Sequence, residues 1–139
     1  MRILVDTCIW SYALRRHSDL SNPKITNELN RFIQNRQVIM LGVIRQEILS
    51  GIAHEAQFDR IRLKLKAFPD YPMSTADFET AAQFYNRCRA KGVQGSNTDF
   101  LICAMAHCYD FTIFTMDKDF YHFKKHLNFK LNLIDSTGE

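Results

Sequence analysis

Short apolar runs alternate with longer segments of helical periodicity along this chain, and this alternation constrains the fold more than any other feature. In the longer segments, apolar residues recur every three to four positions, as in helices that pack on one face. Strands that alternate with helices form a parallel sheet covered on both faces. We therefore expect an α/β/α sandwich of three layers around a mostly parallel sheet of four to five strands. The apolar runs are residues 2–5, 38–41, 111–115 and 130–134.

Several boundaries of the helical segments can be predicted from single residues. Asn22 and Pro23 have the residue types of a helix cap and a first helical position. Gly51 loosens or ends one helix, and Gly92 stops another. The segment 99–109 is apolar nearly all round, which predicts a buried helix. The expected helices are residues 6–16, 21–35, a segment from 42 onwards, 58–68, 74–92, 99–109 and 118–126.

The size and composition of the chain favour one globular domain over residues 1–139. With 46% hydrophobic and 24% charged residues, it has the composition of an ordinary globular protein. Its apolar runs are far shorter than the roughly 18 residues of a membrane span, and residues 2–5 look like a core strand. We therefore expect a cytoplasmic protein. The four cysteines form no C-x-x-C pair, which favours reduced packing residues, and the net charge of +3 permits a polyanionic ligand without requiring one.

Four acidic residues lie where the predicted fold brings distant segments together. Asp6 directly follows the first apolar run, and Asp117 follows residues 111–115 with one residue between. The carboxyl ends of parallel strands share one edge of the sheet, where ligands bind. Asp99 is expected at the start of a buried helix on that side, and Glu47 lies next to the apolar face of another helix. We expect these four side chains to converge in one cleft.

Converging carboxylates repel one another unless something compensates their charge. Two unit charges about 4 Å apart interact by roughly 4 kcal/mol at an effective dielectric constant near 20. A helix N-terminus stabilises a carboxylate by only about 0.3–1 kcal/mol. Either some of the acids stay protonated or a divalent cation lies among them. Oxygen ligands without histidine or cysteine favour Mg²⁺ or Mn²⁺ over zinc. Such an ion would activate water and offset charge on a phosphodiester.

Each acid also has a purely structural interpretation, and these alternatives stay open at the level of sequence. Asp6 could cap the following helix, and Asp99 could be an ordinary acid in a first helical turn. Glu47 alone resembles many surface glutamates. Asp117 and Asp119 cannot be told apart, because one could bind metal while the other caps the next helix. The four positions as a set are more informative than any one of them.

Four segments together resemble the PIN-domain family, and in particular the VapC-type toxin ribonucleases of bacterial and archaeal toxin–antitoxin pairs. "ILVDTCIW" resembles the opening strand of the family with its Asp-Thr pair. "VIRQEILSG" is similar to the helix with the second acid, and "NTDFLICAMA" to the helix with the third. "FTMDKDF" resembles the closing segment. The order and spacing of these segments fit over nearly the whole chain.

This resemblance implies a metal-dependent endoribonuclease that uses Mg²⁺, or alternatively Mn²⁺. The metal-site and catalytic roles would fall on Asp6, Glu47, Asp99 and Asp117, supported by the hydroxyl groups of Thr7 and Thr115 and by Asp119. The resemblance also implies a cognate antitoxin that blocks the enzyme, and a homodimer. Cys8 departs from the family pattern, because many relatives carry asparagine there, and this removes a supporting hydrogen bond.

The contacts to substrate are the least constrained part of the sequence analysis. Five cations lie near segments that enter the expected cleft, and each is an equally good solvated surface residue. Two other functions remain open. One is a metal-dependent nuclease that cuts DNA, and the other is a catalytically silent module that binds RNA or protein. The presence of all four acids argues against the silent module. The candidate phosphate contacts are Arg15, Arg16, Arg45, Lys91 and Lys118.

Overall fold

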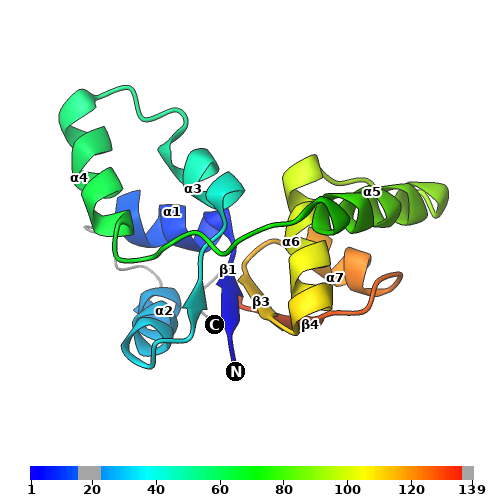
Figure 1. Cartoon of the computed structure of the whole chain (residues 1–139). Coiled ribbons are helices and arrows are strands. Elements are labelled where there is room, and N and C mark those ends of the chain that lie inside the picture. The colour runs from blue at the N-terminus through cyan, green and yellow to red at the C-terminus, as the bar shows by residue number, and fades with distance from the viewer. Residues whose placement is uncertain (16–22, 136–139) are drawn as a thin grey trace.

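The computed structural model describes residues 1–15 and 23–135 of the chain, and within these ranges it contains four strands and seven helices (Figure 1). Arg16 and Asn22 lie outside the described residues. The elements in chain order are β1 (Ile3–Val5), α1 (Thr7–Arg15), α2 (Pro23–Gln34), β2 (Val38–Ile39), α3 (Gly42–Leu49), α4 (Glu55–Leu65), α5 (Thr75–Ala90), α6 (Asn97–Tyr109), β3 (Thr112–Thr115), α7 (Asp119–Lys124) and β4 (Lys130–Leu133).

The four strands form one parallel sheet in the order β2-β1-β3-β4. Leu4 of β1 pairs with Ile39 on one side and with Ile113 on the other. From β1 the chain continues outward to β2, whereas the later strands β3 and β4 add to the opposite side of β1. The strand order therefore reverses between β1 and β3, and a cleft opens at the carboxyl end of a parallel sheet at such a point. The predicted α/β/α sandwich around a mostly parallel sheet of four to five strands is confirmed, and among the described residues the sheet has four strands, all parallel.

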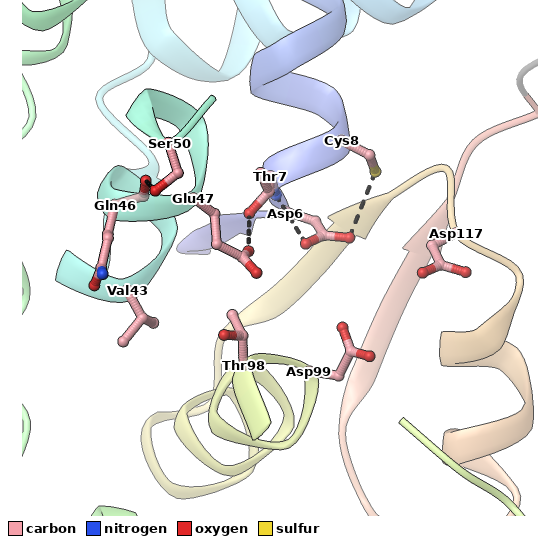
Figure 2. A pocket seen from close by; sticks show the side chains of 10 residues that line it. All are labelled: Asp6, Thr7, Cys8, Val43, Gln46, Glu47, Ser50, Thr98, Asp99 and Asp117. Carbon is pink, nitrogen blue, oxygen red and sulfur yellow. Dashed lines mark hydrogen bonds between the residues drawn. The ribbon is translucent and has the colours of Figure 1, made fainter. Parts of the chain in front are cut away.

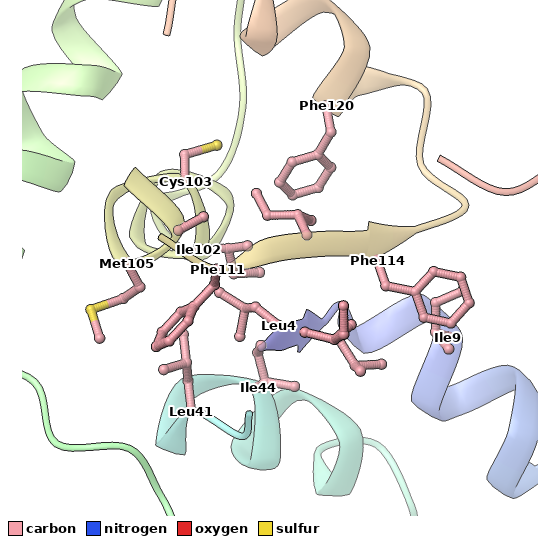
Figure 3. Packing of buried hydrophobic residues seen from close by; sticks show 14 of the residues in the cluster. Leu4, Ile9, Leu41, Ile44, Ile102, Cys103, Met105, Phe111, Phe114 and Phe120 are labelled. Atoms are coloured by element: carbon pink, nitrogen blue, oxygen red, sulfur yellow. The ribbon is translucent and has the colours of Figure 1, made fainter. Parts of the chain in front are cut away.

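Helices cover the sheet on both sides, as its buried central strands β1 and β3 require. In Figure 1, α1 to α4 lie on one side of the central strands and α5 to α7 on the other. Figure 3 shows side chains from α1, α3, α6 and α7 gathered around the central strands, among them Ile9, Ile44, Met105 and Phe120. All three residues of β1 are fully buried. The predicted burial of α6 is also confirmed, because the five consecutive residues from Ile102 to Ala106 are all buried.

Helix α4 and strand β2 differ from their predicted bounds. Helix α4 spans Glu55–Leu65 rather than residues 58–68. Its first turn begins earlier because the His54 carbonyl oxygen accepts the Phe58 N–H at 2.9 Å. It ends earlier because Pro69 disfavours helical backbone at Phe68. Strand β2 is also shorter than residues 38–41, and Met40 instead forms an isolated parallel bridge with Asp70.

None of the helices in the described part of the chain has the length and apolar character that a membrane span requires.

Candidate active site

A cleft lies at the carboxyl edge of the sheet, where the strand order reverses between β1 and β3 (Figure 2). It has a volume of about 590 Å³. All four acids proposed from the sequence line it, so segments far apart in the chain meet here. In Figure 2, the carboxylates of Asp6, Asp99 and Asp117 point toward a shared space, with Glu47 on the side of α3. The lining residues are Asp6, Thr7, Cys8, Val43, Gln46, Glu47, Ser50, Thr98, Asp99 and Asp117.

Asp6 is the most firmly held of these acids. Its backbone N–H donates to the Phe114 carbonyl oxygen at 2.9 Å, which continues the β1–β3 ladder one residue past β1. Its Oδ1 accepts the Thr7 N–H at 2.8 Å, and its Oδ2 accepts the Thr115 hydroxyl at 2.7 Å. The side chain is thus fixed in one orientation, and the residue is only 6% exposed. The Asp6 carbonyl oxygen accepts the N–H groups of Ile9 and Trp10, so Asp6 occupies the position just before α1 and also faces the cleft.

Thr115 from β3 and Cys8 from α1 both support Asp6. The Thr115 hydroxyl accepts the Asp117 N–H at 2.9 Å while donating to Asp6, so its proton has a defined direction. The Cys8 thiol also donates to Asp6 Oδ2 at 3.5 Å, and its sulfur accepts the Met116 N–H. Burial and then the charge of Asp6 raise the pKa of Cys8 to about 12, so the thiol stays protonated and donates. The expectation that Cys8 removes a supporting contact is therefore wrong for this structure, because the thiol supplies one.

Glu47 reaches the cleft from α3 and is tied to the first strand by Thr7. The Thr7 hydroxyl donates to Glu47 Oε1 at 2.6 Å, while the Thr7 N–H holds Asp6. One threonine therefore orients two of the four carboxylates. Sequence reasoning missed Val43, Gln46 and Ser50, which line the cleft beside Glu47. Their spacing of three, four and seven residues along α3 and its cap is the signal that could have identified them, because it places them on one helix face.

Asp99 lies in the first turn of α6, where it takes part in the helix cap and also lines the cleft. The helix begins at Asn97, two residues before the predicted start, because Ser96 caps it. The Ser96 hydroxyl oxygen accepts the Asp99 N–H at 3.1 Å, and Asp99 Oδ2 accepts the Ser96 N–H at 3.0 Å. This reciprocal capping box fixes the carboxylate of Asp99 at the edge of the cleft. The capping interpretation and the site interpretation of Asp99 are thus compatible.

The structure separates Asp117 from Asp119. Asp117 lines the cleft, and its Oδ1 accepts the Asp119 N–H at 2.9 Å. Asp119 begins α7 and is exposed beside a different hollow, next to His122. Asp117 is therefore the residue that faces the other acids, and its carboxylate also accepts the first N–H group of α7.

The carboxylates in the cleft influence one another electrostatically. Burial raises the pKa of Asp6 from 3.8 to about 6; hydrogen bonds from Thr115, Thr7 and Cys8 oppose this shift, and the charge of Asp99 adds to it. Burial also raises the pKa of Asp99; hydrogen bonding from Ser96 opposes this, and the charges of Asp117 and Glu47 add to it. Asp6 and Asp99 therefore bind protons more readily than isolated carboxyl groups do, chiefly because they are buried.

The structure does not bring the proposed phosphate-binding arginine of α3 into the cleft. The Arg45 guanidinium donates to Asp70 Oδ1 at 2.9 Å and to the carbonyl oxygens of Leu65 and Phe68. These bonds tie α3 to the end of α4, so Arg45 has a structural role. Arg15 is the last residue of α1, and Lys91 caps the end of α5. Lys118 is exposed and directly follows Asp117.

The donor set of the cleft suits a hard divalent cation. Within the described ranges, no group of three or more His, Cys, Asp or Glu side chains is placed to hold a metal ion. Mg²⁺ does not require such a cage, because it keeps several waters and binds through one or two carboxylates together with substrate phosphates. Four carboxylates around one cleft and the raised pKa values of Asp6 and Asp99 both fit an ion of this kind.

Two matched serine substitutions separate capping from site geometry. Ser96 caps α6 beside Asp99, and Ser74 caps α5 through an equivalent capping box with Asp77. Each serine-to-alanine change is expected to lower the free energy of unfolding by about 1 kcal/mol, measured by urea denaturation. Ser96→Ala should also slow the reaction at the cleft by about 10-fold or more, because Asp99 loses its fixed position. Equal activity in the two variants would contradict this role of the capping box.

The fold and the cleft together define an α/β protein with an acidic site at the switch point of a parallel sheet. The family model of the PIN domain matches residues 3–126, and the chain belongs to the PIN-domain family. PIN domains are generally nucleases, a class of hydrolases.

Solved structures of toxin–antitoxin complexes have the same fold. One is VapBC2 from Rickettsia felis bound to a DNA fragment from its promoter, with a TM-score of 0.78, 21% identity and coverage of 97% of this chain and 100% of that one. FitAcB from Neisseria gonorrhoeae gives a TM-score of 0.74 at 18% identity, covering 93% of this chain and 95% of that one. FitAB bound to an IR36 DNA fragment gives 0.75 at 21% identity, covering 94% of each. No curated protein sequence matches this chain.

Proposed function

We propose that this protein is the toxin of a toxin–antitoxin pair and acts as a metal-dependent endoribonuclease. The observation that carries the proposal is the convergence of Asp6, Glu47, Asp99 and Asp117 in one cleft at the switch point of the sheet. RNA is preferred over DNA as the substrate because of the resemblance of four motifs to the VapC-type ribonucleases. An antitoxin partner is supported by the toxin–antitoxin complexes that share this fold.

Each residue has a defined part in the proposed reaction. Asp6, Asp99 and Asp117 would hold the metal ion together with its own water ligands, and Glu47 would add a fourth carboxylate on the α3 side. When bound by these residues, Mg²⁺ or Mn²⁺ would supply activation of a water molecule and would offset charge on the phosphate. Thr115 and Thr7 keep the carboxylate of Asp6 oriented, and Thr7 also holds Glu47 in place. Hydrolysis of a phosphodiester bond is the reaction that this arrangement favours. We further propose a cytoplasmic homodimer that the antitoxin blocks.

The test is a cleavage assay with purified protein free of antitoxin. The protein is incubated with a mixed pool of structured RNA and with a matched DNA pool, in Mg²⁺, in Mn²⁺ or in EDTA. Asp99→Asn is the control, because asparagine keeps an acceptor for the Ser96 N–H but removes the charge. We expect the wild type to cut RNA only with metal, and we expect the variant to have lost this activity.

The other outcomes distinguish the remaining functions. Cleavage of DNA alone would keep the site and overturn the choice of substrate. No cleavage and no metal binding, measured by calorimetric titration with Mn²⁺, would overturn the enzyme proposal and favour a silent binding module. Metal-dependent cleavage that persists in Asp99→Asn would show that the active site lies elsewhere.

A further inference from the structure

The acidic cleft cannot attract a nucleic acid by itself. Among the described residues that line it, none is a lysine or an arginine, while four are carboxylates. A polyanion that enters such a cleft needs cations next to it, because phosphate contacts supply most of the binding free energy. Arg45 is already bonded within the protein. Lys118, by contrast, directly follows Asp117 of the cleft and is exposed. A cationic surface next to the cleft therefore begins at Lys118, at the start of α7.

The outer face of α7 carries a stripe of basic and aromatic side chains, which we call the α7 stripe. Lys118 and Lys125 cap the helix at its two ends with helical backbone angles, so the helical spacing extends over both. The intervals of three, four and seven residues place all four members on one face. Each member is exposed, and Tyr121 is 53% exposed. The α7 stripe consists of Lys118, Tyr121, His122 and Lys125.

The α7 stripe combines the two groups that single-stranded nucleic acids bind. The Lys125 Nζ lies 4.9 Å from the centre of the Tyr121 ring, and the His122 ring lies 5.7 Å from it. Lysine pairs with phosphate, and an exposed tyrosine ring can stack on a base. In the described part of the chain, no carboxylate forms an ion pair with Lys118 or Lys125. The one acid on α7, Asp119, lies at the edge of the stripe beside His122.

The inner face of α7 fixes the stripe relative to the catalytic carboxylates. Phe120 and Phe123 are fully buried on the side opposite to the stripe. The Phe123 ring packs 4.9 Å from the Phe100 ring, and Phe100 directly follows Asp99 in the first turn of α6. At its other end, α7 is attached to Asp117 through the bond from the Asp119 N–H. The stripe is thus held next to two of the cleft acids.

We propose that the α7 stripe binds single-stranded RNA and guides it into the cleft; the choice of RNA rests on the proposed function. Lys118 and Lys125 bind backbone phosphates, and Tyr121 stacks on an unpaired base. The two lysines are seven residues apart, which is about 10 Å along a helix, so they contact different phosphates. Double-stranded RNA binds less well at this site, because its bases are already stacked within the duplex and cannot reach Tyr121.

The test measures RNA binding separately from RNA cleavage. The probe is a fluorescent single-stranded RNA about 12 nucleotides long, titrated against full-length Asp99→Asn protein so that it stays intact. On this background, Tyr121→Ala should weaken binding by roughly 5- to 150-fold, whereas Tyr121→Phe should retain it. Lys118→Gln with Lys125→Gln should reduce the slope of log affinity against log salt by about 1.4, because two phosphate contacts are lost.

A matched control removes the same charge elsewhere. Lys64 and Lys66 are exposed on α4 and its cap, away from α7 in Figure 1. Lys64→Gln with Lys66→Gln should leave the salt slope unchanged. The inference is overturned if the stripe and control variants behave alike, if Tyr121→Ala binds as its parent does, or if duplex RNA binds as tightly as single strands. It is also overturned if the parent binds no RNA. RNA cleavage by the wild-type protein is measured in parallel, so that a failure of the proposed function can be told apart from a failure of the α7 stripe.

Discussion

Replacing Asp6 with asparagine is expected to slow metal-dependent RNA cleavage by on the order of 100-fold or more. Asparagine removes the charge that would hold a cation, and it also conflicts with the local hydrogen bonds. Asp6 accepts the Thr7 N–H on one oxygen and the Thr115 hydroxyl on the other. Because Thr115 also accepts the Asp117 N–H, its proton cannot easily turn away. In Asp6→Asn, the side-chain NH₂ group would therefore face either the Thr7 N–H or the Thr115 hydroxyl, and both of these groups are donors.

Thermal unfolding in a Mg²⁺ titration checks this result without relying on activity. The wild type should gain about 2.7 kcal/mol of stability when the free ion reaches 100 times its dissociation constant, whereas Asp6→Asn should gain little. Asp59→Asn on α4 is the matched control and should behave as the wild type does, since Asp59 lies outside the cleft. Full cleavage by Asp6→Asn, or an unchanged Mg²⁺ response, would rule out Asp6 as a metal ligand.

Loss of the fold is not the expected cause of this defect. Burial raises the pKa of Asp6 to about 6, above its ordinary value of 3.8. A carboxyl group whose pKa is higher in the folded state stabilises the fold when protonated, and this contribution is lost as the pH rises toward 6 and beyond. At neutral pH the charged side chain therefore destabilises the protein without metal. A neutral residue removes that penalty, and circular dichroism should show a folded variant.

The sequence contained most of the information about the sheet because hydrophobic periodicity depends directly on burial. Short continuous apolar runs indicated strands covered on both faces, and three of the four acids could be placed by their position after a strand or at a helix start. The predicted bounds of α4 and β2 were wrong because individual backbone hydrogen bonds decide where these two elements begin and end. The His54 carbonyl bond to Phe58 and the pairing of Met40 with Asp70 leave no periodic signal in the sequence.

The surroundings of the acids were less predictable than the acids themselves. Arg45 was a candidate substrate contact because it lies near a segment that enters the cleft. It precedes Glu47 by two residues, however, and this interval places it on a different face of α3, toward Asp70. Asp117 and Asp119 were equivalent in sequence, and the bond from the Asp119 N–H to Asp117 separates them. The Cys8 thiol donates to Asp6, which is close in sequence, but its sulfur accepts the Met116 N–H from the segment that follows β3. Such contacts depend on tertiary packing.

Replacing Gly95 with alanine is expected to lower the free energy of unfolding by about 1–3 kcal/mol. A Cβ atom at this position would lie 2.6 Å from Cζ of Phe123 and 3.0 Å from Cε2 of Phe100. Both rings are buried and pack against each other, so neither can move aside without disturbing the core. The strain falls on the junction between the loop before α6, the first turn of α6 and α7. The capping box of Asp99 begins one residue later, at Ser96.

Gly42→Ala is the matched control for this prediction. A Cβ atom at Gly42 would meet Asp70 Oδ2 at 3.6 Å, which is an ordinary van der Waals contact. Urea denaturation should therefore show little loss of stability, or a gain of about 0.4–1 kcal/mol from the reduced freedom of the unfolded chain. A second-site change gives a sharper test of the mechanism. Phe123→Leu removes the atom that Gly95→Ala approaches most closely, so the double variant should lose less stability than the two single losses added together. Purely additive losses would mean that steric overlap with Phe123 is not the cause.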